Sequence, residues 1–133
     1  MGVPEAVLRK QGPLDDAEWA LMREHPAAGE LIVRGVATLR EAAAAIRHHH
    51  ERYDGTGYPD GLAGVAIPIE ARIVAAADAF AAMTAERAHA APRTPLQAAA
   101  ELRRGAGSQL DPGVVGALLD VLGMAARPAL RVA

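Results

Sequence analysis

The sequence contains no cysteine, which excludes disulfide bonds and zinc sites built from thiolates. Aromatic residues are scarce, with one Trp, two Tyr and one Phe in 133 residues. The chain has no apolar run long enough to span a bilayer and no signal-peptide pattern at its N-terminus. These absences predict a cytoplasmic protein whose core is packed largely by small aliphatic side chains.

Neither sign of charge dominates, since 14 Lys and Arg residues oppose 16 Asp and Glu residues. Bulk electrostatics therefore predicts no attraction to a nucleic acid polymer or to an anionic membrane. The chain also lacks a Walker-type glycine loop, a GxSxG motif and an HExxH motif. Its single serine, Ser108, does not suggest a nucleophilic triad.

What the chain does contain is abundant alanine and a series of helix start and stop signals. The acidic residues Asp15 and Asp16 cap a helix with the sequence AEWALMREH. Pro26 is expected to end that helix and to start a second one through residues 27–34. A third helix is predicted over residues 39–51, where apolar residues recur at helical spacing.

Residues 52–68 hold four glycines and two prolines and are predicted to form a long loop. A further helix is predicted from Pro68, and the cap signals Thr94-Pro95-Leu96-Gln97 and Asp111-Pro112 predict two more. No segment alternates with the two-residue period of a strand. The prediction is an all-α helical bundle of about six helices with one long glycine-rich loop.

The run HHHE at residues 48–51 is the first candidate for chemistry. Helical spacing places His50 on the apolar stripe and His49 about 100° around the axis, so both imidazoles could reach one metal cluster. The ordinary alternative is an exposed His48 and a hydrogen-bonded His50 in the core. Because the run leads directly into a glycine-rich loop, the metal interpretation is favoured.

Asp78 and His25 are the other candidate ligands. Asp78 is the only charged residue within IVAAADAFAAM, and a buried carboxylate needs a cation, either a metal or an arginine such as Arg47 or Arg72. His25 ends the first predicted helix, where the alternative role is a C-terminal helix cap. Histidine and aspartate ligands without sulfur favour iron, manganese or zinc.

The loop sequence DGTGYPDGLAGVAIP contains two Asp-Gly turn signals that flank a rigid Tyr58-Pro59 edge. A simple linker is one interpretation. The ordered turn chemistry favours a loop of defined shape with a function, and its length exceeds that of most connections.

Taken together, HHERYDGTGYPDGLAGVAIP, RIVAAADAF, TAER and GSQLDP, in this order, resemble the HD-GYP domains of bacterial cyclic-di-GMP phosphodiesterases. The opening GVPEAVLRKQGPLDDAEWALMREHPAAGE resembles the segment that precedes these motifs in that family. The match covers about residues 2–122, so we expect one partial HD-GYP domain over residues 1–123 and a tail over residues 124–133. The resemblance implies an all-α HD-domain fold and a role in signal transduction, including two-component response regulators.

The resemblance also implies a divalent metal cofactor, with two or three iron or manganese ions in the intact family, and cyclic-di-GMP as the substrate. Further implications concern individual residues: metal ligands at His25, His49, His50 and Asp78, a substrate contact at Arg87, and contacts with diguanylate cyclase (GGDEF) domains through Gly57, Tyr58 and Pro59.

The sequence departs from the family pattern in three places. The His-Asp-x-Gly-Lys motif, which supplies the bridging ligand pair and a lysine, would precede Met1 and is absent. Ala81 replaces a second aspartate, and Ala88-His89-Ala90 replaces a Pro-Tyr-basic run. We therefore expect a fragment or a misassigned start codon, with no catalytic dyad and little activity as the chain stands. The alternatives are a non-catalytic module that binds a GGDEF partner, and another HD-superfamily phosphohydrolase acting on nucleotides.

Overall fold

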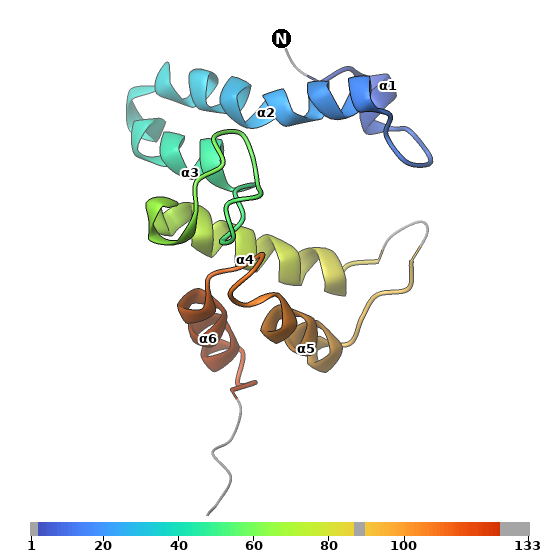
Figure 1. Ribbon diagram of the computed structural model, residues 1–133, viewed down its shortest axis with the longest axis vertical. Coiled ribbons are helices and arrows are strands. Elements are labelled where there is room, and N and C mark those ends of the chain that lie inside the picture. The colour runs from blue at the N-terminus through green and yellow to red at the C-terminus, as the bar shows by residue number, and fades with distance from the viewer. Residues whose placement is uncertain (1–2, 87–89, 126–133) are drawn as a thin grey trace, which may run out of the picture.

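The computed structural model describes residues 3–86 and 90–125, and its regular elements are all helical. In chain order these are α1 (Glu5–Leu8), α2 (Asp16–Arg34), η1 (Ala37–Ala42), α3 (Ala43–His48), η2 (Gly64–Ala66), α4 (Ile69–Thr84), α5 (Pro95–Gly105) and α6 (Pro112–Val121). Helix α3 packs between α2 and α4, and α5 and α6 pack on the other side of α4 (Figure 1). The all-α prediction is confirmed.

The predicted cap signals start three of these helices. Asp15 accepts a hydrogen bond from the backbone N–H of Glu18, whose carboxylate accepts the N–H of Asp15 in return. Thr94 and Gln97 form the same reciprocal pair at the start of α5. Asp111 accepts two backbone N–H groups at the start of α6. Each cap satisfies amide groups that have no partner inside the helix.

Pro26 does not end a helix, so the predicted break there is wrong. Helix α2 continues through it from Asp16 to Arg34, and the Pro26 ring is fully buried. The third predicted helix is also shorter than expected, because residues 37–42 form a 3-10 helix and α3 ends at His48. The short helix α1 was not predicted from the sequence.

The apolar core lies in the C-terminal half, among α4, α5 and α6. Leu102 of α5 is almost fully buried there, against partners that include Ala76 of α4 and Leu119 of α6. Phe80 and Met83, the larger side chains of α4, pack against the same cluster. Met124, which the sequence analysis assigned to the tail, also packs on it.

Helices α2 and α3 approach closely at Gly29. A Cβ added there would lie 2.9 Å from Cγ2 of Ile46, so any larger residue would displace the Ile46 side chain. The buried residues of α2 are Pro26 and Glu30. The contact between α2 and α3 is therefore tight but contains little apolar bulk.

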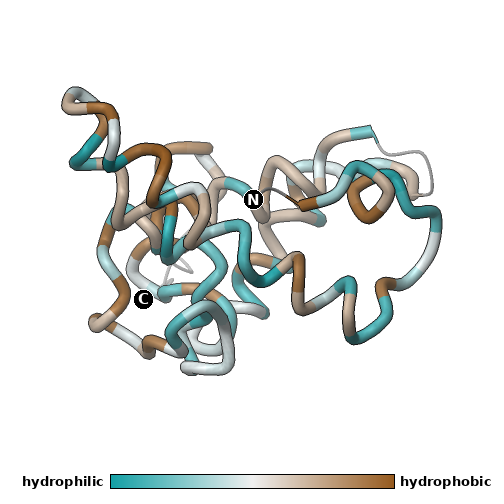
Figure 2. The backbone as a smooth tube through the Cα atoms, turned by 90° about the horizontal axis from the view of Figure 1, so that it is seen from above, coloured by the Kyte–Doolittle hydropathy of each residue, from teal (hydrophilic) through white to brown (hydrophobic). Residues whose placement is uncertain are grey.

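Hydrophobic residues occur in short stretches throughout the described part of the chain (Figure 2). Among residues 3–86 and 90–125, no helix combines the length and the apolar character that crossing a bilayer requires.

Candidate metal centre

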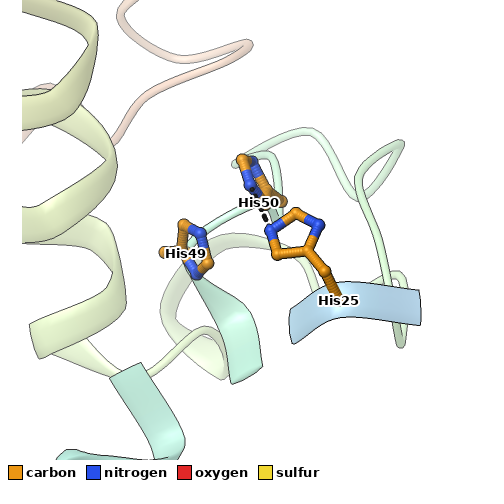
Figure 3. A group of neighbouring side chains, drawn as sticks. All are labelled: His25, His49 and His50. Atoms are coloured by element: carbon orange, nitrogen blue, oxygen red, sulfur yellow. Dashed lines mark hydrogen bonds between the residues drawn. The ribbon is translucent and has the colours of Figure 1, made fainter. Parts of the chain in front are cut away.

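Three imidazoles converge at one point between α2 and the end of α3. His25 comes from the middle of α2, and His49 and His50 directly follow α3 (Figure 3). One ring nitrogen from each lies within 4.8 Å of the others. The Nε2 atoms of His25 and His50 are 3.1 Å apart. That separation is close to what two nitrogens need when both bind one ion at about 2.0–2.1 Å.

Two of the imidazoles are oriented by backbone carbonyl groups. Nδ1 of His25 lies 2.6 Å from the Met22 carbonyl oxygen, and Nδ1 of His49 lies 2.7 Å from that of Ile46. A carbonyl oxygen can only accept, so Nδ1 must carry the proton in both rings. A ring that carries only this one proton then has its lone pair on Nε2. Such an outer hydrogen bond is typical of histidines that bind metals.

The orientation of the His50 ring is determined by neighbouring rings and not by a backbone carbonyl. Its ring stacks on Tyr58, with centroids 5.0 Å apart and planes 21° from parallel. Burial, followed by the neighbouring His49 and His25 rings, lowers the pKa of His50 to about 4, and Asp78 opposes this shift. The ring is therefore neutral at pH 7, so one of its two nitrogens carries a lone pair.

Gly57 allows the loop to fold back over this ligand. A Cβ at position 57 would lie 2.6 Å from the His50 carbonyl oxygen and would collide with the backbone nitrogen of Arg52. The backbone N–H of Tyr58 in turn donates to the His50 carbonyl at 3.3 Å. Any side chain at position 57 would push Tyr58 away from the His50 ring.

Asp78 is exposed, so the premise that it is a buried carboxylate is wrong. Its two suggested arginine partners are engaged elsewhere: Arg47 with Glu30, and Arg72 with Asp111.

Asp78 lines a cavity of about 140 Å³ together with His49 and His50, but it does not join the tight cluster of three nitrogens. Its role as a metal ligand stays a prediction.

His48 does not belong to this cluster and is not solvent-exposed as the ordinary interpretation assumed, since its side chain is only 13% exposed. It lies beside Glu51 and Asp60, and these three residues form a second group with the spacing of metal ligands. The Glu51 carboxylate, however, already accepts the backbone N–H groups of Asp60 and Leu62. This group therefore acts as a clamp on the loop.

Arg47 completes the clamp. Its guanidinium donates to Asp60 at 2.8 and 2.9 Å and to Glu30 at 2.7 Å, which ties the loop to α3 and α2. These hydrogen bonds to Asp60 and Glu30 raise the pKa of Arg47 further above its ordinary value. The loop also contacts the turn between α5 and α6, because the amides of Tyr53 and Asp54 donate to carbonyls of that turn.

The shape predicted for the loop is thus present, whereas the predicted contacts of Gly57, Tyr58 and Pro59 with a GGDEF domain stay a prediction. Within this structure Tyr58 stacks on the His50 ring and Gly57 lies against the backbone of His50. Arg87, the predicted substrate contact, lies outside the described residues. The roles of Glu30, Arg47 and Glu51 were not predicted from the sequence, although an acidic residue directly after the histidine run was a usable signal.

Comparison with known proteins places these features in context. The family model of the HD domain matches residues 1–114. The cyclic di-GMP phosphodiesterase response regulator RpfG of Xanthomonas campestris pv. campestris is 43% identical over 121 residues, which cover 90% of this chain and 32% of that protein. The 3'3'-cGAMP-specific phosphodiesterase 2 of Vibrio cholerae is 40% identical over 122 residues, covering 90% of this chain and 23% of that protein.

A solved structure shows the same fold. The crystal structure of a cyclic GMP-AMP specific phosphodiesterase of V. cholerae superposes with a TM-score of 0.68 at 19% identity, covering 89% of this chain and 31% of that one. The chain spans less than a third of the length of each of these three proteins.

Proposed function

Because this chain belongs to the HD domain family, we propose that it forms the metal-binding part of a phosphodiesterase that hydrolyses cyclic dinucleotides, with cyclic di-GMP as the expected substrate. Relatives named as cyclic di-GMP and 3'3'-cGAMP phosphodiesterases support this class of substrate. The observation that carries the proposal is the convergence of His25, His49 and His50 on one point.

The residues present fit a divalent metal ion. Nδ1 of His25 and of His49 is occupied by a carbonyl, which leaves Nε2 of each ring free to bind. His50 is neutral at pH 7 because of its low pKa. Nitrogen donors beside a carboxylate suit iron or manganese, our expectation for this site, with Asp78 as the further ligand. Such a metal would polarise a phosphoryl oxygen and lower the pKa of a coordinated water.

The cavity beside the histidines limits what part of the substrate enters. At about 140 Å³ it is smaller than the roughly 300–1,000 Å³ of most small-molecule sites. One phosphodiester group is therefore the part that the cavity admits, while the bases extend outside. Arg52 and Gln109 line it as well. The Arg52 guanidinium is held by Asp54 and Thr56, so its position at the wall is fixed and its charge is balanced by the Asp54 carboxylate.

Metal titration and turnover assays test this function. We expect the metal-free protein to bind Mn²⁺. Because the His-Asp-x-Gly-Lys motif is absent from this sequence, we expect its cleavage of cyclic di-GMP to be slow and to depend on added Mn²⁺. His49→Ala should weaken Mn²⁺ binding by about 10-fold or more, since even outer partners of a ligand contribute this much. His48→Ala, next in the chain but outside the cluster, is the matched control and should retain binding.

Two results would contradict the proposal: an isothermal titration without Mn²⁺ binding to the folded wild-type chain, or equal binding by His48→Ala and His49→Ala. Parallel assays with 3'3'-cGAMP decide which cyclic dinucleotide is preferred.

A further inference from the structure

The position of Pro26 has a chemical consequence for His25. In an α-helix the amide N–H of residue 26 would donate to the carbonyl of residue 22. Proline has no N–H, so α2, which continues through Pro26, leaves the Met22 carbonyl without its helical partner. Nδ1 of His25 lies 2.6 Å from that same oxygen. Because Pro26 has no amide hydrogen, the Met22 carbonyl oxygen is left to accept a hydrogen bond from the His25 side chain.

His49 obtains its acceptor in a different way. Its Nδ1 lies 2.7 Å from the carbonyl oxygen of Ile46, and α3 ends at His48, within the last turn that leaves carbonyls unpaired. Both rings therefore use a carbonyl that lacks an ordinary helical partner. At the end of a helix such carbonyls are freely available, whereas in the middle of a 19-residue helix they are not.

The tautomer of His25 decides whether it can bind a metal at the cluster. With the proton on Nδ1, the lone pair of Nε2 faces the His50 ring, whose Nε2 lies 3.1 Å away. With the proton on Nε2, an N–H group would face that point instead, and metal binding would require the proton to move. The Met22 carbonyl selects the first arrangement because it can only accept a hydrogen bond.

We propose that Pro26 is a positioning residue for the metal site: by withholding its amide hydrogen it reserves the Met22 carbonyl for Nδ1 of His25 and so directs Nε2 toward His49 and His50. The proposal rests on the proposed function, since it assumes that the three histidines bind a metal. It assigns Pro26 a role beyond packing, although the ring is also fully buried.

Pro26→Ala tests the proposal, because an alanine at this position restores the amide that competes for the Met22 carbonyl. The matched control is Pro95→Ala at the exposed first residue of α5, where the amide has no carbonyl partner inside the helix. The first readout is the His25 tautomer in metal-free, ¹⁵N-labelled protein, from long-range ¹H–¹⁵N correlation spectra. We expect Nδ1 protonation in the wild type and in Pro95→Ala, and a shift toward Nε2 protonation in Pro26→Ala.

The second readout is the Kd for Mn²⁺, which should rise by about 10- to 100-fold in Pro26→Ala and stay unchanged in Pro95→Ala. A folded Pro26→Ala with the wild-type tautomer and Kd would overturn the proposal. If that variant does not fold, the wild type alone decides, because protonation of His25 on Nε2 there would also overturn it. A wild type that binds no Mn²⁺ would refute the proposed function, while the tautomers would still report on Pro26.

Discussion

The two halves of this molecule are held together by different forces. The C-terminal half, α4 to α6, surrounds an apolar cluster centred on Leu102. The N-terminal half, α2, α3 and the loop, is joined by ion pairs, buried carboxylates and a glycine contact. The hydrophobic effect is non-directional, whereas a hydrogen bond depends on both the distance and the angle between donor and acceptor. The half that carries the histidines is therefore held mainly by directional contacts, and the other half mainly by buried apolar surface.

The sharpest way to test this comparison is to remove the centre of the apolar half. Leu102→Ala should lower the free energy of unfolding by about 2–5 kcal/mol, because a buried leucine leaves a cavity. Leu96→Ala is the matched control, since Leu96 lies on the same helix and is 74% exposed. Chemical denaturation measures both. Equal, small losses for the two variants would show that the apolar cluster does not stabilise the fold.

The converse test breaks the histidine half. Gly57→Ala places a Cβ against the backbone of His50 and Arg52, and we expect a loss of about 1–3 kcal/mol together with weaker Mn²⁺ binding. Gly116→Ala in α6, where no atom lies within 4 Å of the new Cβ, should instead stabilise by up to about 1 kcal/mol. Denaturation and Mn²⁺ titration distinguish the two. Unchanged Mn²⁺ affinity in Gly57→Ala would show that the loop does not support the site.

The smallest effect concerns a polar contact within the apolar half. Burial alone would raise the pKa of Asp111, but hydrogen bonds from Arg72 and from the amides of Val114 and Gly113 lower it below its ordinary 3.8. Because the pKa of Asp111 is lower in the folded protein than in the unfolded chain, ionised Asp111 stabilises the fold. This stabilisation is complete above pH 3.8 and is lost as the pH falls through the pKa of the folded state. Asp111→Asn, which can still cap α6, should cost about 1 kcal/mol at neutral pH and remove this acid-dependent loss.

Denaturation between pH 2 and pH 7 measures the slope of the free energy of unfolding against pH. Asp120→Asn, an exposed change on the same helix, should leave it in place. A slope that persists unaltered in Asp111→Asn would assign the acid sensitivity to other carboxylates.

Local signals in the sequence were sufficient for the helix starts, because a cap such as Thr94 with Gln97 depends on residues three positions apart. These local signals gave the wrong result at Pro26. The helix continues there, with the Pro26 ring fully buried and the His25 side chain hydrogen-bonded to the Met22 carbonyl that proline leaves without an amide partner. They also failed for Asp78, because α4 is so rich in alanine that its sequence does not show which side faces solvent. The approach of His25 to His49 depends on contacts between distant segments.

Arg47 shows what these long-range contacts require of a sequence. The planar Arg47 guanidinium donates one hydrogen bond to the Glu30 carboxylate on α2 and two parallel hydrogen bonds to the Asp60 carboxylate on the loop. A lysine would preserve the charge but not the directions of these bonds. Charge alone is therefore not sufficient at this position. Arg47→Lys would keep the positive charge but lose the paired hydrogen bonds that link α2 to the loop.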